Sequence, residues 1–176
     1  MADNLISSVN LDIVMARSLD KGNWFTSVLD ALKGVSFSLK TASSFVPGAA
    51  TTWSTKHIAL PQNWFSRTDL ARRALLCHEG RHILQRRNVG DTWFSIKYVA
   101  SANYRAQMEL AAHRDEVHYF YSLGFRYWGQ GARSTGESVT NLVDDLKENY
   151  YLFGVSDKWL YDEVNGIYKA AQRIWG

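Results

Sequence analysis

The sequence predicts an α+β fold in which a small twisted sheet precedes a mainly helical C-terminal half. Strand signals occur at residues 35–39 and 50–60, and from residue 66 onward apolar side chains recur at helical spacing. The chain has 176 residues, of which 46% are hydrophobic and 21% are charged. Since this length supports one sizeable core but hardly two, we expect a single domain over residues 1–176.

The N-terminal region carries a helical pattern. Residues 9–33 show helical spacing in two pieces, which are separated at Lys21-Gly22. Gly34 is expected to end the second piece, because glycine readily adopts the backbone conformation found after a helix C-terminus.

Two strands are predicted next. Residues 35–39 alternate strictly between apolar and polar side chains, which is strand periodicity. Threonine-rich residues 50–60 predict a second strand, and Pro47-Gly48 predicts the turn or loop before it.

The rest of the chain is predicted to be helical. Ser66 and Asp69 fit a capping box, which predicts a helix over residues 67–87, and a second long helix is predicted over residues 103–123. The stretch between these two helices predicts only a connection. Two amphipathic helices follow, with apolar positions at Val139, Leu142, Val143, Leu146 and Tyr150 in the first and Leu160, Val164, Ile167, Ala171 and Ile174 in the second.

Charge and hydropathy exclude several classes of partner. The formal net charge of +3 is too small to predict nucleic-acid binding, and no nucleic-acid motif is present. The N-terminus lacks a basic segment followed by an apolar one, so we expect no signal peptide. No apolar run approaches the roughly 18–20 residues of a membrane span, so we expect no membrane partner.

The stretch LLCHEGRHIL places polar side chains in an apolar helical run, at a spacing that suits a metal ion. His78 and His82 are one turn apart and about 40° apart around a helix axis, so both imidazoles can bind one ion. Glu79 projects about 100° from His78, where it can reach a water molecule on that ion. This HExxH pattern predicts a Zn²⁺ site with Glu79 as general base. The alternative is two core histidines bonded to backbone groups.

The chain resembles the zincin metallopeptidases over about residues 51–124. HEGRH matches their signature, and KHIALP followed by SRTDLARRALLCHEGRH resembles the zincin order of an edge strand leading into the active-site helix. HEGRHILQ also resembles the HExxHxxQ form of several small peptidase-like families. The resemblance implies a zincin-like fold, with the sheet covering the HExxH helix, and a zinc metalloendopeptidase that acts on a peptide or protein substrate.

The branches of that family differ in the third zinc ligand. The metzincin pattern requires Gly at position 85 and His at position 88, where this chain has Gln85 and Asn88, so that branch is excluded. The gluzincin pattern takes a Glu from a later helix, which implies Glu109 here. Thermolysin-like gluzincins have an Asp four residues further on, but this chain has His113. His113 therefore stays an alternative third ligand.

The sequence also predicts the surroundings of this site. On the helix over residues 103–123, the inward arc includes His113, whereas Asp115 and His118 are expected to point away. Donors that could stabilise an oxyanion are Tyr98, Tyr104, Arg105 and His118, and the sequence does not rank them. Four tryptophans are most simply core residues, namely Trp24, Trp53, Trp64 and Trp93.

A non-enzymatic role is the alternative to hydrolysis. The chain leaves little sequence for substrate subsites, and the aromatic C-terminal half could bind a partner in a protein assembly. Because no signal peptide or membrane span is predicted, we expect a cytoplasmic protein or, since small zincin-like proteins also occur in tailed-phage genomes, a virion-associated one. The presence of Glu79 favours the enzyme, because a zincin that had lost activity would be expected to lose this residue first.

Overall fold

The computed structural model describes residues 2–19, 24–41, 49–126, 132–150, 152 and 154–176, and within them the predicted α+β class is confirmed. The expected breaks at Lys21-Gly22 and Pro47-Gly48 lie outside these residues. The chain divides into two compact units, Met1–Asp91 and Thr92–Gly176. A single domain over residues 1–176 stays a prediction.

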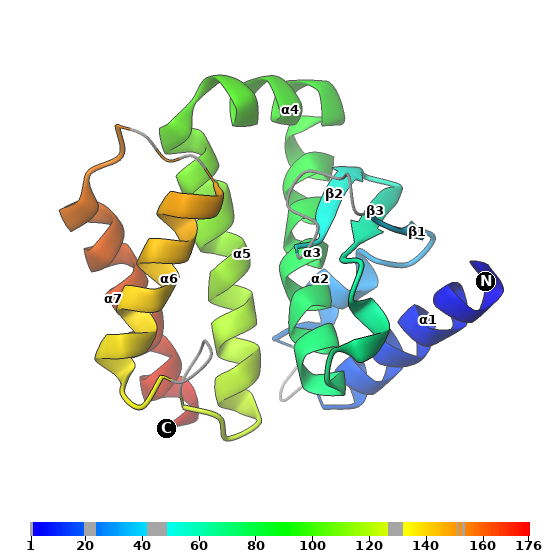
Figure 1. The fold of residues 1–176 in the computed structure, drawn as a ribbon, viewed down its shortest axis with the longest axis horizontal. Helices are drawn as coiled ribbons and strands as arrows, with labels where there is room; N and C mark the ends of the chain where they lie inside the picture. The colour runs from blue at the N-terminus through cyan, green and yellow to red at the C-terminus, as the bar shows by residue number, and fades with distance from the viewer. Residues whose placement is uncertain (1, 20–23, 42–48, 127–131, 151, 153) are drawn as a thin grey trace. The chain divides into compact units, whose positions relative to one another are not determined.

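Among its described residues, the first unit contains three α-helices and the sheet (Figure 1). The helices are α1 (Ala2–Ser18), α2 (Thr26–Asp30) and α3 (Asp69–Val89), and a short 3-10 helix (Trp64–Ser66) precedes α3. The first predicted helix thus begins earlier than residue 9. Gly34 has a φ of 72°, the left-handed conformation expected at the end of the second piece.

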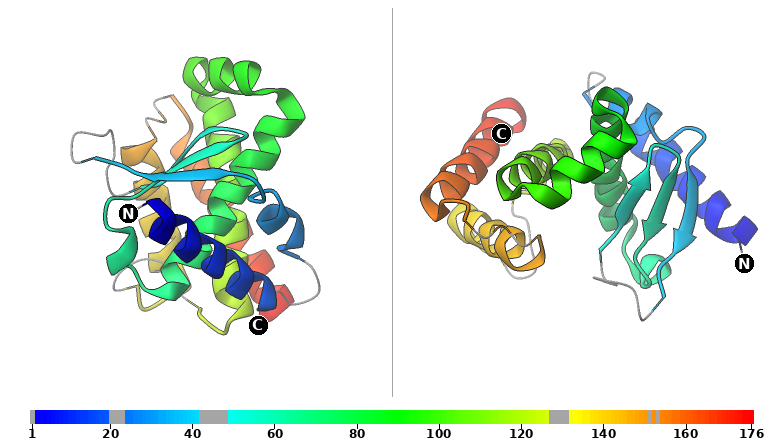
Figure 2. Two further views of the ribbon diagram at one scale, coloured as in Figure 1. Left: turned by 90° about the vertical axis from the view of Figure 1, so that its right-hand side faces the viewer. Right: turned by 90° about the horizontal axis from the view of Figure 1, so that it is seen from above.

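The sheet is mixed and has three short strands among the described residues. They are β1 (Ser36–Leu39), β2 (Thr51–Ser54) and β3 (His57–Leu60), in the order β1-β3-β2. β1 pairs parallel to β3, and β2 pairs antiparallel to it. β2 packs along α3, and β1 packs along α1 (Figure 2).

Two strand predictions need correction. The single strand expected over residues 50–60 is wrong, because the chain reverses at Thr55 and forms the β2–β3 pair. The Asp91 carboxylate stabilises this reversal by accepting two hydrogen bonds from Thr55. The Thr55 N–H donates to Oδ1 and the Thr55 Oγ1–H donates to Oδ2, both at 3.1 Å. KHIALP was expected to be the edge strand, but it forms the central strand β3, whereas β2 lies at the edge beside α3.

The long helix α3 begins at a different cap from the predicted one. The Thr68 Oγ1 accepts a hydrogen bond from the Ala71 N–H at 3.2 Å. Ser66 belongs to the 3-10 helix, where its Oγ donates to the Asn63 carbonyl. The capping box at Ser66 is therefore wrong, although the helix itself is confirmed. Gly90, with a φ of 89°, ends it.

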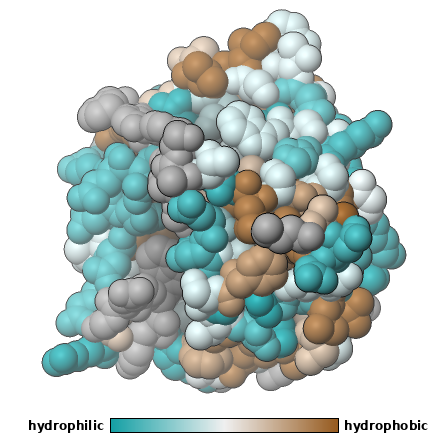
Figure 3. Space-filling model, turned by 45° about the vertical axis from the view of Figure 1, so that its right-hand side comes forward, coloured by the Kyte–Doolittle hydropathy of each residue, from teal (hydrophilic) through white to brown (hydrophobic). Residues whose placement is uncertain are grey.

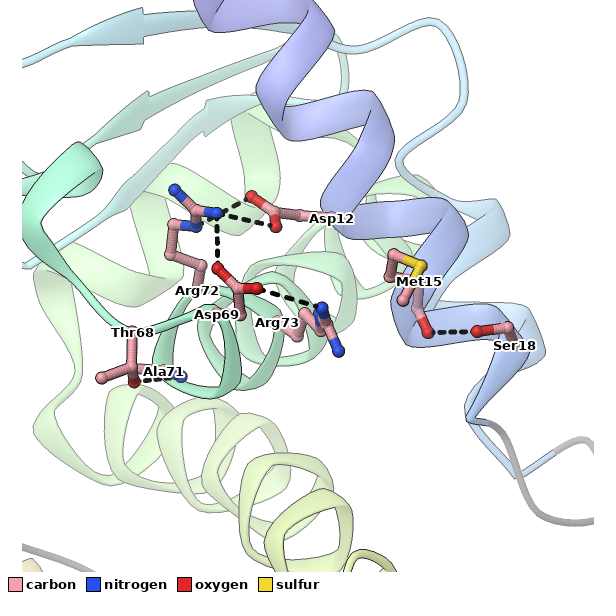
Figure 4. A network of polar contacts seen from close by, with 8 residues as sticks. All are labelled: Asp12, Met15, Ser18, Thr68, Asp69, Ala71, Arg72 and Arg73. Atoms are coloured by element: carbon pink, nitrogen blue, oxygen red, sulfur yellow. Dashed lines mark hydrogen bonds and ion pairs between the residues drawn. The ribbon is translucent and has the colours of Figure 1, made fainter.

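A buried ion pair joins α1 to the first turn of α3 (Figure 4). Arg72 Nε lies 3.1 Å from Asp12 Oδ2, and Arg72 Nη2 lies 2.8 Å from Asp69 Oδ1. Arg73 also pairs with Asp69. Burial raises the pKa of the Asp12 carboxyl above 3.8, and this effect exceeds the opposing effect of the Arg72 charge. The cost of burying the Asp12 charge therefore offsets part of what this ion pair contributes to stability.

The second unit is helical in all its described elements. It contains α4 (Asp91–Ala100), whose first residue belongs to the first unit, together with α5 (Ala102–Ser122), α6 (Thr135–Asn149) and α7 (Asp157–Trp175). The last three confirm the prediction, but α4 was expected to be only a connection. α7 packs on both α5 and α6. The core of this unit is Ala106, Leu110, Val117, Tyr121, Val139, Leu142, Val143, Leu146, Leu152, Leu160, Val164, Tyr168 and Ala171.

The tryptophans divide between core and surface. Trp64 is buried, but Trp24, Trp53 and Trp93 are 41%, 63% and 63% exposed, so the core assignment is wrong for these three. Apolar side chains also reach the surface in separate patches among hydrophilic ones (Figure 3). None of the helices in the described part of the chain combines the length and apolarity of a membrane span.

Candidate metal centre

The middle of α3 carries His78, Glu79 and His82, and all three side chains are buried. α3 is helical here because the Thr68 cap satisfies its first turn and because long apolar side chains face the sheet and α2. The helix thus brings the three motif residues together within two turns, as the sequence predicts.

The two histidines face each other through the same ring nitrogen. His78 Nε2 and His82 Nε2 are 3.1 Å apart, and the rings meet edge to face at a centroid distance of 4.9 Å. Two nitrogens bound to one tetrahedral zinc at about 2.05 Å lie about 3.3 Å apart, so the observed spacing fits a shared ion within a few tenths of an ångström. The predicted pair of metal ligands therefore has a suitable geometry.

Gln85, one turn further along α3, contacts the far side of the His82 ring. Its Oε1 lies 2.8 Å from His82 Nδ1, and both side chains are buried. The sequence analysis assigned no role to Gln85 beyond the HExxHxxQ resemblance. The spacing of three residues on one helix is the signal that could have predicted this contact.

Glu79 is bound by a residue of the sheet. Thr52 Oγ1, on β2, donates a hydrogen bond to Glu79 Oε2 at 2.6 Å, and the pair is buried. Lys40 lies close enough for the Glu79 charge to act on it. Burial lowers the pKa of the Lys40 ammonium below 10.5, and Glu79 acts in the opposite direction. Neither Thr52 nor Lys40 was predicted from the sequence to lie near Glu79.

The residues predicted from the later helix lie on α5, in the second unit. There the Tyr98 hydroxyl donates a hydrogen bond to Glu109 Oε1. His113 Nδ1 lies 3.0 Å from Glu116 Oε2, and the His113 ring meets the Tyr150 ring edge to face. Glu109 and His113 therefore each have a neighbouring group that orients them. Their roles as metal ligands stay predictions.

The remaining predicted donors have structural contacts within the second unit. The Arg105 guanidinium donates to the Tyr98 carbonyl at the end of α4 and, through Nε, to the Tyr150 carbonyl at 2.7 Å. Tyr98 is engaged with Glu109, and Tyr104 packs against Phe94. The contacts of Arg105 resemble those of a cation that caps a helix C-terminus.

His118 and Asp115 do not point away as predicted, because both are buried. The Trp175 indole Nε1–H, at the end of α7, donates to His118 Nδ1 at 3.0 Å. Burial lowers the pKa of His118 from 6.5 to about 4, with a smaller opposing effect of Asp115. The prediction that these two side chains face solvent is wrong because α7 covers that side of α5.

Comparison of the chain with protein-family models, with curated proteins and with solved structures finds no match. Any function must therefore be argued from the residues of the site.

Proposed function

We propose that this protein is a zinc-dependent metallopeptidase with a zincin-like arrangement of sheet and active-site helix. The observation that carries the proposal is the histidine pair on α3, whose Nε2 atoms are 3.1 Å apart, with the buried carboxylate of Glu79 on the same helix. An HExxH helix beside an antiparallel edge strand, β2, further supports the zincin-like fold.

The proposed chemistry assigns a different task to each residue. Zinc, when bound, lowers the pKa of a coordinated water and polarises the scissile carbonyl. His78 and His82 would hold the ion through their facing Nε2 atoms. Glu79 accepts the proton of the attacking water and then delivers it to the leaving amine. Thr52 fixes Glu79 through Oε2, so that the carboxylate keeps one orientation.

We propose Glu109 as the third zinc ligand, with His113 as the alternative. The gluzincin resemblance favours Glu109, and the hydrogen bond from Tyr98 to its Oε1 restricts the carboxylate. The contact of His113 Nδ1 with the Glu116 carboxylate is the kind of support that metal-bound histidines commonly have. Zinc affinities of Glu109→Gln and His113→Ala decide between them, because loss of a ligand weakens binding far more than loss of a supporting contact.

Glu79→Gln tests the enzymatic function. Glutamine has nearly the same shape and can still accept the Thr52 hydrogen bond, so the variant should keep zinc, whereas hydrolysis should fall by several orders of magnitude because the base is lost. The measurement is cleavage of a diverse peptide pool by wild type and variant, with zinc content determined in parallel. Equal cleavage by both would contradict the peptidase. Zinc binding without any cleavage would favour a non-enzymatic component of an assembly.

A further inference from the structure

Gln85 contacts the His82 ring at the nitrogen that faces away from His78. His82 Nδ1 is 2.8 Å from Gln85 Oε1, while His82 Nε2 is 3.1 Å from His78 Nε2. The two ring nitrogens of His82 therefore have different partners, and both partners lie on α3. We propose that Gln85 is a positioning residue that holds His82 in the tautomer able to bind a metal. This inference rests on the proposed zinc centre.

Metal binding by His82 depends on which ring nitrogen carries the imidazole proton. A neutral imidazole has one N–H, and only the other nitrogen offers a lone pair to a metal. When the Gln85 carbonyl oxygen accepts from Nδ1–H, the proton is held on Nδ1 and the lone pair remains on Nε2, which faces His78. Gln85 thus supports metal binding without touching the ion.

The contact is also built into a single element. Gln85 follows His82 by three residues, so the two side chains are neighbours on the surface of one helix. Both side chains are buried, which limits competition from water for the hydrogen bond. The tautomer is therefore set by α3 before any metal binds, and it needs no rearrangement of the sheet or of the second unit.

Two substitutions at Gln85 distinguish the effect of its carbonyl oxygen from the effect of its amide N–H groups. Gln85→Glu keeps an acceptor and removes the N–H donors, whereas Gln85→Met keeps the length and removes both. If the carbonyl oxygen is the active group, Gln85→Glu should bind zinc at least as tightly as wild type. Gln85→Met should bind about 10–100-fold more weakly, the usual effect of losing such a supporting contact. Gln172→Met, at an exposed position on α7, is the matched control and should leave the affinity unchanged.

The experiment is competition of the 176-residue chain with a chromophoric zinc chelator at neutral pH, together with ¹⁵N NMR of the His82 ring in metal-free protein. We expect Nδ1-protonated His82 in wild type and in Gln85→Glu, and loss of this preference in Gln85→Met. Unchanged zinc affinity and tautomer in Gln85→Met would overturn the role of Gln85. So would weaker binding by Gln85→Glu than by Gln85→Met, because the amide N–H would then be the group that contacts His82.

A different result would contradict the zinc centre itself. A wild-type chain that binds no zinc in this competition would overturn the metal centre, and the role of Gln85 with it. A wild-type chain that binds zinc no more tightly than Gln85→Met would overturn only the role of Gln85.

Discussion

Thr52 is the residue through which the sheet acts on the proposed catalytic base. Its hydroxyl is the donor to Glu79 Oε2, at 2.6 Å in a buried environment. Thr52→Val has almost the same shape but removes the donor, so we expect the free energy of unfolding to fall by about 1–3 kcal/mol. Peptide hydrolysis should also fall, since the carboxylate is no longer held. Chemical denaturation and cleavage assays measure the two effects, and Thr52→Ser should restore both.

His118 predicts a pH dependence of stability. Its pKa is about 4 in the folded chain, against 6.5 when it is exposed, so the unfolded chain binds more protons between these values. The contribution of His118 to stability is complete above pH 6.5 and is lost as pH falls toward 4, with a total on the order of 3 kcal/mol. His118→Gln should remove this part of the pH dependence. Identical pH profiles of unfolding free energy for wild type and variant would contradict the assignment.

At the scale of single residues, the sequence could predict contacts made within one helix. His78 and His82 face each other because residues four apart on a helix must do so, whatever the rest of the chain does. Thr52 and Lys40 reach Glu79 from the sheet side, and this depends on strand register and on the packing of β2 against α3. Neither is readable from one sequence, because a register shift of one residue would turn Thr52 away.

Among the elements, the stability of α3 depends on the N-cap of its first turn. The Thr68 hydroxyl accepts from the Ala71 N–H, whereas Ser66 makes its contact inside the 3-10 helix. Thr68→Ala should therefore lower the free energy of unfolding by about 1 kcal/mol, as loss of an N-cap usually does. Ser66→Ala, the matched control, should have a smaller effect. The comparison is made by denaturant titration, and a larger loss in the Ser66 variant would place the cap where the sequence predicted it.

The packing of α2 against α3 depends on a glycine inside the HEGRH motif. A Cβ at position 80 would lie 3.0 Å from the carbonyl carbon of Val28 and closer still to its oxygen. Alanine favours a helix by about 1 kcal/mol over glycine, but relieving a clash with backbone costs more, typically about 1–3 kcal/mol. We therefore expect Gly80→Ala to destabilise the protein in thermal unfolding. Gly166→Ala, at a helical position with open space, should instead stabilise it.

The β2–β3 reversal and α4 were mispredicted for two different physical reasons. The β2–β3 reversal contains no glycine or proline, and the hydrogen bonds that Thr55 donates there are accepted by Asp91, far along the chain. The apolar residues of α4 are largely exposed, as at Trp93, Ile96 and Val99, so their spacing does not mark a buried face. In contrast, α6 and α7 each bury one apolar stripe, and the sequence predicted both.

For the whole molecule, a zinc centre would add to the stability of the fold. An ion that binds only the folded chain stabilises it by about 4 kcal/mol when its free concentration is about a thousand times its dissociation constant. We therefore expect a chelator to lower the midpoint of thermal unfolding and added zinc to restore it.

A surface histidine provides the control for this measurement. His57→Ala, on β3 and hydrogen-bonded to Ser36 and Ser38, should respond to chelator as the wild type does, whereas His78→Ala should not respond. A wild-type midpoint that chelator leaves unchanged would argue against a stabilising metal.

The close approach of α2 to Gly80 has a consequence for the pattern of substitution among homologues. The atoms that exclude a side chain at position 80 belong chiefly to the Val28 backbone, and a backbone carbonyl is present whichever residue occupies position 28. Substitution at position 28 therefore does not relieve the constraint, and no compensating change is expected there. In an alignment, position 80 should be invariant yet should show no covariation with position 28, so methods that infer contacts from correlated substitutions would miss this one.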